Sequence, residues 1–372
     1  MKIKRPKILI YLPNLQGGGA ENVITILSNE FIKLNQKVLL VVDHKHGPNL
    51  KNLSKKIDLY SLDTSNFLKR LYLLLYILRK NNPCIFLSTL TSANILGFLA
   101  TSLLGMRHKH FVRVAAHHTW SIKYANSIKR KLGLYFMVFI FRYCGNIISV
   151  SKSVTNDLKS NWKINGNKIH TISNPFKIDV RTFDLSSNKS TSSFLSLKSK
   201  SNISILSSGR FVYQKGFNFL LDTFFDFQKD FPGSSLTILG EGPQHNALFL
   251  RAKELKISHL VNLPGYVDDI AKYFLAADVF VLTSLWEGMP NVLLDAFSYN
   301  LPIIATDSPG GTAEMLEYGS LGALIPVNDK NALLSELNNI LKFKYLSGFD
   351  RKILFKKYSP SNIAVEYLEA FF

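Results

Sequence analysis

Two carboxylates stand eight residues apart in TSLWEGMPNVLLDAF, residues 283–297. Glu287 follows a short apolar run at 279–282, which predicts a buried strand, and Asp295 lies in an amphipathic segment, which predicts a helix. A carboxylate can accept hydrogen bonds from two neighbouring hydroxyl groups, and a ribose or a hexose offers such pairs. The alternative is structural: Glu287 caps a helix or pairs with a lysine, and Asp295 is an exposed helix residue. Spacing alone leaves both interpretations open.

Glycines and basic residues follow other apolar runs. Three glycines at 17–19 come after the run at 7–12, and Arg210 and Lys215 follow the run at 203–209. Glycine lets the backbone approach a ligand, while helix N-termini and basic side chains bind phosphate. Singly, the glycines are typical of a tight turn and Lys215 of a solvated surface residue. Together at one sheet edge they favour a nucleotide-sugar site.

Short apolar runs alternate with segments of helical period along most of the chain. Strands are expected at residues 7–12, 37–42, 84–88, 111–116, 146–150, 203–209, 235–240, 260–265, 279–284, 302–307 and 321–327. Continuous apolar strands separated by helices predict parallel sheets covered on both faces. We therefore expect an α/β protein with two doubly wound, Rossmann-like domains facing each other across a cleft. In such sheets, ligands bind beyond the carboxyl ends of the strands.

The length of 372 residues fits two domains better than one. We expect an N-terminal domain at 1–180, a Ser- and Lys-rich linker or insertion at 181–202, and a C-terminal domain at 203–357. The last segment, 358–372, opens with Ser359 and Pro360, a helix-start signal. This segment is expected to form a helix that packs back toward the N-terminal domain.

The positive charge belongs to the N-terminal half. Residues 1–180 hold 27 Lys and Arg against 7 Asp and Glu, a net charge of +20, and residues 181–372 hold 18 against 19, a net charge of −1. Such asymmetry indicates that one half faces an anionic surface or ligand. A general enrichment of surface lysine is the alternative.

Composition narrows the class of protein. The two cysteines, Cys84 and Cys144, lie in apolar contexts, which excludes a disulfide framework or a cysteine-based metal site and fits a reducing cytoplasm. No apolar run reaches the ~20 residues needed to cross a bilayer, and the run at 8–12 is too short for a signal peptide. No nucleic-acid-binding motif accompanies the basic charge, so we expect no nucleic-acid partner.

Several motifs resemble the family 4 retaining glycosyltransferases. SSGRFVYQKGF (207–217), EGMPNVLLDAF (287–297) and PGGTAE (309–314) resemble the family's donor-binding domain. GGGAEN (17–22), ISVSKSVTNDL (148–158) and TISNPFKID (171–179) resemble its N-terminal half, while the match is loose between about 45 and 110. The resemblance implies the GT-B fold, with a nucleotide-sugar bound mainly by the second domain and an acceptor bound mainly by the first.

The resemblance also implies roles for individual residues. Arg210 and Lys215 match the pair that contacts the donor diphosphate, and Glu287 matches the first glutamate of the family's E-x7-E motif, at the donor sugar. The loop whose backbone faces sugar and phosphate, ahead of a helix aimed at the diphosphate, matches Gly288, Met289, Pro290 and Asn291. The N-terminal loop that closes over the phosphates matches Gly17 and Gly18.

One position departs from the family pattern, and two neighbouring histidines compete for another. Asp295 occupies the second glutamate position, expected at the ribose hydroxyls, and departs from the family because aspartate is one methylene shorter. In RVAAHHTWS (113–121), His117 matches the family's N-domain histidine near the donor sugar. His118, one residue away, stays open as an alternative, as does a histidine satisfied only by backbone.

Retention of anomeric configuration is implied by the resemblance. It is described as a front-face substitution, in which the departing phosphate oxygen accepts the proton of the acceptor. No Asp-x-Asp metal motif is present. This agrees with a GT-B enzyme that uses no metal ion or other cofactor and stabilises its leaving diphosphate with Arg210, Lys215 and helix dipoles.

We expect transfer of a hexose or N-acetylhexosamine from a nucleotide-sugar to a polyprenyl-diphosphate-linked or other glycan acceptor. A UDP-sugar is the preferred donor. The product would be a capsule, O-antigen or similar surface polysaccharide.

Two segments, residues 67–80 and 128–145, are apolar with flanking cations. They predict docking on the anionic inner face of the cytoplasmic membrane. Packing of both segments on the first sheet is the alternative. Other candidate functions are a soluble enzyme with a small acceptor, a GT-B nucleotide-sugar epimerase and a non-enzymatic nucleic-acid binder.

Overall fold

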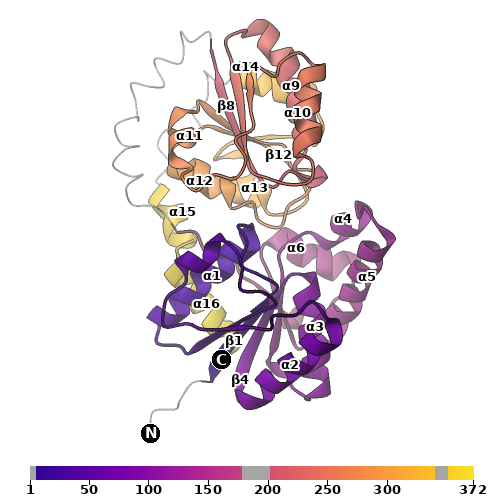
Figure 1. Cartoon of the computed structure of the whole chain (residues 1–372). Coiled ribbons are helices and arrows are strands. Elements are labelled where there is room, and N and C mark those ends of the chain that lie inside the picture. The colour runs from indigo at the N-terminus through magenta and orange to yellow at the C-terminus, as the bar shows by residue number, and fades with distance from the viewer. Residues whose placement is uncertain (1–5, 178–201, 340–350) are drawn as a thin grey trace. The chain divides into compact units, whose positions relative to one another are not determined.

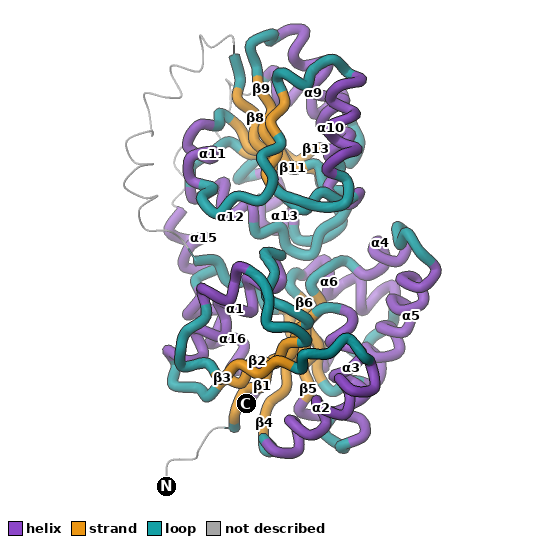
Figure 2. Tube along the Cα trace, in the orientation of Figure 1, coloured by secondary structure: helices purple, strands orange, loops and turns teal. Residues whose placement is uncertain are grey.

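The computed structural model describes residues 6–177, 202–339 and 351–372, and the chain divides into two compact units. Unit 1 spans Met1–Lys177 and Phe355–Phe372, and unit 2 spans Ile178–Leu354. Each unit is built on a parallel sheet with helices on both faces (Figure 1, Figure 2). The chain rejoins unit 1 at Phe355, slightly before the boundary expected at residue 357. The expected linker at 181–202 lies outside the described residues except for Asn202.

Unit 1 has a seven-stranded sheet in the order β3-β2-β1-β4-β5-β6-β7. Its strands are β1 (Lys7–Leu12), β2 (Val38–Val42), β3 (Asp58–Ser61), β4 (Cys84–Thr89), β5 (His110–Val114), β6 (Asn146–Ser149) and β7 (Ile169–Thr171). Its helices are α1 (Gly19–Lys33), α2 (Phe67–Lys80), α3 (Thr91–Leu103), α4 (His118–Lys123), α5 (Ile128–Tyr143), α6 (Lys152–Asn156) and α16 (Pro360–Phe371). Short helical turns include η1 (Pro48–Asn52) and η3 (Asp157–Asn161). The sequence predicted all of these strands except the short β3 and β7.

Strand β1 shows why its sequence is apolar throughout. Ile8 and Ile10 belong to a core shared with α1 and α16, whereas Leu9 and Tyr11 belong to a second core shared with α2 and α3. Successive side chains of a strand point to opposite faces, so a strand covered on both sides needs buried residues at every position.

The C-terminal helix α16 belongs to unit 1 and packs on α1, as Figure 1 shows. Ser359 caps the helix by accepting a hydrogen bond from the Asn362 N–H at 3.3 Å. Arg113 of β5 is fully buried, and its guanidinium donates to the Tyr367 hydroxyl at 3.2 Å and to the side-chain oxygen of Asn174. Arg113 therefore links β5 both to Asn174, near the end of the first segment of unit 1, and to the returning helix α16.

Unit 2 has a six-stranded sheet in the order β10-β9-β8-β11-β12-β13. Its strands are β8 (Ser204–Ser208), β9 (Ser235–Leu239), β10 (Val261–Asn262), β11 (Val279–Leu282), β12 (Ile303–Thr306) and β13 (Ala323–Ile325). Its helical segments are η5 (Tyr213–Lys215), α9 (Phe217–Asp230), α10 (His245–Glu254), α11 (Ala271–Ala276), α12 (Val292–Ser298), α13 (Thr312–Met315), η6 (Glu317–Gly319) and α14 (Lys330–Asn338). Helix α15 (Arg351–Lys357) spans the return to unit 1. Buried residues of α9, α10 and α14 form one core with the sheet.

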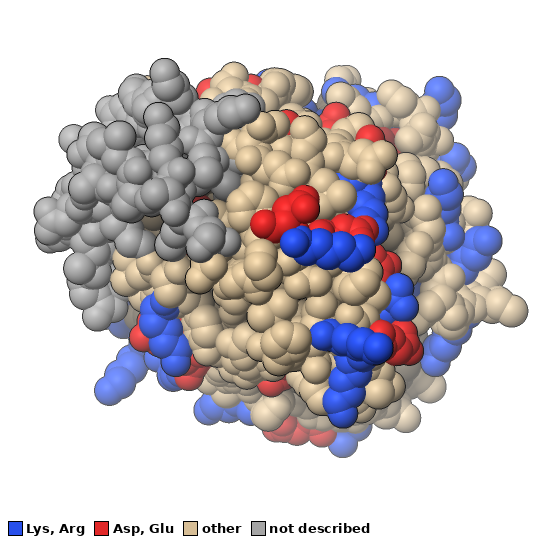
Figure 3. All heavy atoms as spheres, turned by 90° about the horizontal axis from the view of Figure 1, so that it is seen from above, with Lys and Arg blue, Asp and Glu red and all other residues tan. Residues whose placement is uncertain are grey.

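Several surface charges of unit 2 form ion pairs. Asp226 lies within ion-pair distance of Lys229 and Lys330, and Arg251 of Asp222. Near the centre of the face seen in Figure 3, basic side chains lie beside acidic ones over a mainly uncharged surface, and further basic side chains lie along its edges.

Candidate functional site

Unit 2 brings four loops together at one sheet edge. Strands β9, β8, β11 and β12 are adjacent in the sheet, and all of them are parallel. Their carboxyl ends therefore lie at the same edge, where parallel sheets bind ligands. Lys215 follows β8, and Glu287 follows β11. Residues 72 positions apart in the sequence meet there.

Lys215 and Glu287 form a shielded ion pair. The Lys215 ammonium lies 2.6 Å from Oε1 of Glu287, and the Ser284 hydroxyl donates to the same oxygen at 2.6 Å. The exposed fraction is 15% for the Lys215 side chain and 8% for that of Glu287. Within the described residues, the second carboxylate oxygen of Glu287, Oε2, accepts no hydrogen bond. One oxygen thus anchors the side chain, and the other is available as a hydrogen-bond acceptor.

Backbone contacts hold the loop that carries Glu287. The Glu287 N–H donates to the Pro309 carbonyl at 2.8 Å, and the Gly311 N–H donates to the Gly288 carbonyl at 2.8 Å. Gly310 has φ of +135°, and a Cβ there would lie 2.4 Å from the carbonyl oxygen of Glu287. Only glycine fits this approach, so the PGGTAE motif serves as the frame of the Glu287 loop.

The other predicted residues of unit 2 differ in their surroundings. Gly288, Met289 and Pro290 are buried, and Asn291 is the residue that precedes α12. Arg210 is exposed, and it forms no ion pair with any residue that the structure describes. Lys215 is therefore fixed by Glu287, whereas the Arg210 side chain lies open to solvent.

Asp295 lies in the first turn of α12 and is partly buried. Burial raises the pKa of its carboxyl group to about 7. Its carboxylate accepts no hydrogen bond within the described part of the chain. The structure thus leaves an unpaired acid in this helix, and the interpretation of Asp295 as an ordinary exposed residue is wrong.

Asp295→Asn should stabilise unit 2 more at pH 8 than at pH 5. The pKa of the folded state lies above the ordinary value of 3.8, so the charged form opposes folding. This cost is absent well below pH 4, grows as the pH rises and is complete above pH 7. We expect the gain in the free energy of urea unfolding to be about 2–3 kcal/mol larger at pH 8. The exposed Asp307→Asn is the control, and equal gains at both pH values would contradict the prediction.

Unit 1 carries the predicted glycine loop between β1 and α1. Gly17 is exposed, and Gly18 is the N-cap residue of α1, with an extended backbone (φ −72°, ψ 156°). The Gly18 carbonyl accepts a hydrogen bond from the Asn22 N–H at 3.0 Å. Both glycines therefore lie where a chain enters a helix of 15 residues.

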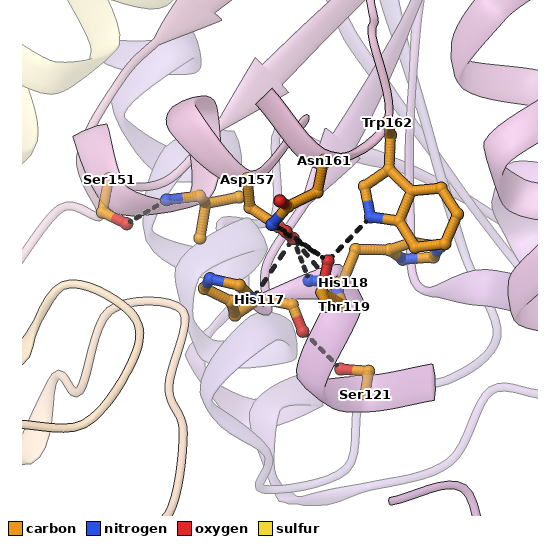
Figure 4. Close-up of polar contacts among 9 residues, drawn as sticks. His117, His118, Thr119, Ser121, Ser151, Asp157, Asn161 and Trp162 are labelled. Carbon is orange, nitrogen blue, oxygen red and sulfur yellow. Dashed lines mark hydrogen bonds and ion pairs between the residues drawn. The ribbon is translucent and has the colours of Figure 1, made fainter. Parts of the chain in front are cut away.

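The two candidate histidines have distinct surroundings (Figure 4). Nε2 of His118 bonds to the Leu134 carbonyl at 2.9 Å, and its ring packs edge-on against Phe141 and Trp162. His118 therefore serves the packing of α4 on α5. Nδ1 of His117 lies 3.2 Å from Asp157 but without hydrogen-bond geometry, and it has no other partner among the described residues. Burial lowers the pKa of His117 below its ordinary value and so favours its neutral form, although the nearby Asp157 carboxylate acts in the opposite direction.

Asp157 organises this region, and sequence reasoning missed it. One of its oxygens accepts from the N–H groups of His118 at 2.8 Å and Thr119 at 3.1 Å. The other accepts from Asn161 at 2.8 Å and from the Thr119 hydroxyl. Asp157 thus caps α4 from a distance, at the helix start that His117 immediately precedes. A signal was present, because Asp157 is the only acidic residue between Asp63 and Asp179.

Two family models match the chain. Glycosyltransferase Family 4 matches residues 17–180, and Glycosyl transferases group 1 matches residues 188–347. An uncharacterized glycosyltransferase of Methanocaldococcus jannaschii is 30% identical over 293 residues, which cover 73% of this chain and 70% of the relative. The chain belongs to the family 4 glycosyltransferases.

One further relative and one solved structure are informative. The relative from Campylobacter jejuni named N-acetylgalactosamine-N,N'-diacetylbacillosaminyl-diphospho-undecaprenol 4-alpha-N-acetylgalactosaminyltransferase is 25% identical over 217 residues, 58% of this chain and 56% of that protein. The HepE protein of Anabaena, solved with UDP and glucose, matches with a TM-score of 0.78 at 16% identity, over 98% of this chain and 99% of HepE. The expected GT-B fold is confirmed. Within the described residues, no group of His, Cys, Asp and Glu could hold a metal ion.

Proposed function

We propose that this protein transfers a hexose or N-acetylhexosamine, with retention of configuration and without a metal ion, from a UDP-sugar to a polyprenyl-diphosphate-linked glycan. The observation that carries the proposal is the Glu287 carboxylate, with one oxygen fixed by Lys215 and Ser284 and the other without a partner among the described residues. The bound UDP and glucose of HepE and the undecaprenol-linked substrate in the name of the Campylobacter relative support the choice of donor and acceptor.

The proposed chemistry breaks one bond and forms one on the same face of the sugar. The bond from the anomeric carbon to the diphosphate oxygen breaks, and the acceptor oxygen bonds to that carbon. The acceptor proton moves to the departing phosphate oxygen, so no side chain need act as a base. Lys215 and Arg210 stabilise the charge that grows on the diphosphate, and Glu287 accepts from a sugar hydroxyl.

The remaining residues take binding roles in this proposal. Gly17, Gly18, Gly288, Met289, Pro290 and Asn291 contact the donor. His117, whose neutral form is favoured by burial, exchanges a hydrogen bond with the donor sugar from its place beside Asp157. Asp295 accepts from the ribose hydroxyls and, because of its raised pKa, does so best above pH 7.

Thermal unfolding with UDP, GDP, ADP and their sugar conjugates tests the donor. A specific ligand present at 100 times its Kd stabilises the folded state by about 2.7 kcal/mol. We expect UDP and one UDP-sugar to raise the unfolding temperature, and NMR of the product to show the anomeric configuration of the donor. Absence of a shift with any nucleotide at millimolar concentration, or an inverted product, would count against the proposal.

We also propose that the outer face of α5 places the enzyme on the anionic inner surface of the cytoplasmic membrane. The inner face of α5 packs in unit 1 through residues such as Phe141, so the packing alternative holds for that side only. The outer stripe consists of Ile128, Leu132, Tyr135, Phe136, Phe139 and Tyr143, all exposed. Their spacing follows the helical repeat, and Lys129, Arg130, Lys131 and Arg142 lie on the same helix. Basic residues near anionic lipid contribute about 1 kcal/mol each.

Such a surface fits peripheral docking of an enzyme whose acceptor is held in the membrane by a lipid. None of the helices in the described ranges has the length and apolar character needed to span a bilayer.

Replacing Phe136 and Phe139 by Ser should weaken binding to vesicles of mixed anionic and zwitterionic lipid at least tenfold, since each ring contributes up to about 1.5–3 kcal/mol on burial. Co-sedimentation measures the binding, and 0.5 M salt should weaken it further. Phe249→Ser, at a similarly exposed phenylalanine on α10, is the matched control. Equal vesicle binding by both variants would rule out the α5 surface.

A further inference from the structure

The glycine loop of unit 1 takes its backbone partners from the segment that follows β2. Strands β1 and β2 are parallel neighbours that end side by side at Leu12 and Val42. Beyond them, the Asp43 N–H donates to the Pro13 carbonyl at 2.9 Å, and the Leu15 N–H donates to the His46 carbonyl at 3.0 Å. Residues 43–49, called the brace here, thus run alongside residues 13–16.

Asn49 makes the brace contact nearest to the glycines. Its backbone N–H donates to the Leu15 carbonyl at 3.2 Å, and its side-chain amide donates to the Gln16 carbonyl at 2.9 Å. Asn49 is 6% exposed and Gln16 is exposed, so this hydrogen bond ties a surface loop to a buried side chain. The Gln16 carbonyl belongs to the peptide bond that joins Gln16 to Gly17. The Asn49 amide therefore fixes the peptide group at the start of the glycine pair.

Close packing reinforces these hydrogen bonds. Gly47 has φ of +122°, and a Cβ there would lie 2.2 Å from the Leu15 carbonyl oxygen. The brace can approach the glycine loop this closely only because residue 47 has no side chain.

The brace is itself anchored to the rest of unit 1. The buried Asp43 carboxylate accepts from the Tyr11 hydroxyl at 2.5 Å and from the Arg70 guanidinium of α2 at 2.6 Å. Asp43 and Asn49 therefore anchor the two ends of the brace. The brace in turn fixes the position of residues 13–16, which lead into the glycine pair.

We propose that Asn49 is a positioning residue that sets where Gly17 and Gly18 meet the donor, without touching the donor itself. This inference rests on the proposed function, which gives the two glycines a substrate-binding role. A loop that is already in position loses less conformational freedom when the nucleotide-sugar binds. Pre-positioning by Asn49 should therefore increase the affinity for the nucleotide-sugar. The effect of losing Asn49 should therefore fall on KM rather than on kcat.

The test compares Asn49→Leu with Asn29→Leu. The Asn29 amide donates to the Asn52 carbonyl at 2.8 Å, so it makes the same kind of bond between α1 and η1, away from the glycines. Asn49→Leu should raise KM for the UDP-sugar about three- to tenfold, the loss of roughly one hydrogen bond, with kcat within twofold. It should also speed amide hydrogen exchange in residues 14–19. Asn29→Leu should change neither.

Each other outcome overturns the inference. Parental KM in Asn49→Leu, with or without faster exchange, means that the glycine loop needs no such positioning. Equal rises of KM in both variants mean a general loss of stability in unit 1. Failure of the proposed function is distinguishable, because the unaltered protein would then neither bind nor turn over any nucleotide-sugar, while the exchange comparison would still report whether Asn49 orders the loop.

Discussion

Lys215→Ala should lower kcat/KM ten- to a hundredfold. The Lys215 ammonium is held 2.6 Å from Glu287 in a shielded position at the carboxyl edge of the unit 2 sheet. In the proposed reaction it stabilises charge that develops on the leaving diphosphate. A hydrogen bond to a charged group is worth about 1.5–3 kcal/mol, and each 1.36 kcal/mol is tenfold in rate. Release of UDP, measured with the sugar donor that stabilises the protein, gives the rates.

The structure adds a second consequence of Lys215→Ala. The variant also removes one of the two groups that anchor Glu287, so the carboxylate would be held by Ser284 alone and could not keep the orientation that the proposed reaction requires. Lys229→Ala is the matched control, because Lys229 pairs with Asp226 at the same 2.6 Å but its side chain is 54% exposed. Exposed pairs contribute about 0–1 kcal/mol, and activity should stay near normal. Near-normal activity of Lys215→Ala would remove Lys215 from the site.

Much of the fold was predictable because its strands are buried on both faces. Strands such as β1 and β11 are continuous apolar runs, and the helices between them are long enough to show their period. The short strands β3 and β7 were missed for the same physical reason. Their residues are at most partly buried, so no apolar pattern marks them, and only pairing with β2 and β6 makes them strands.

The candidate site was predictable only in part. The rule that loops meet at the carboxyl edge of a parallel sheet was enough to bring Lys215 and Glu287 together. It could not show that Ser284 shares the same carboxylate oxygen, or that His118 points into the packing between α4 and α5 while His117 lies beside Asp157. These depend on side-chain direction and on partners from distant segments.

Asn49 and Asp157 show what kind of residue the sequence hides. Asn49 belongs to no motif, Asp157 lies within ISVSKSVTNDL without a role of its own there, and each acts on backbone groups of another segment. A side chain that orders a loop gives no pattern of its own, since its partners are carbonyl and N–H groups that every residue has. Such residues were found only through the contacts.

Tyr367→Ala should be the most destabilising of the substitutions considered, because Tyr367 joins α16 to the rest of unit 1. Its ring is fully buried and lies 6.3 Å from that of Phe31 and 5.9 Å from that of Phe371, measured between centroids. Removing a buried aromatic ring costs about 3–5 kcal/mol through lost burial and the cavity that remains. Urea unfolding followed by circular dichroism should show this loss.

Two further variants separate the ring from the hydroxyl and from the helix itself. Tyr367→Phe keeps the ring but leaves the buried Arg113 guanidinium without one of its acceptors, which should cost about 1.5–3 kcal/mol. Val365→Ala lies on the exposed face of α16 and should change stability by less than about 0.5 kcal/mol. If Tyr367→Ala unfolded no more easily than Val365→Ala, α16 would be a loosely attached tail. The helix shares a core with β1, β2 and α1. Detachment of α16 should therefore destabilise the part of the sheet from which the glycine loop and the brace extend.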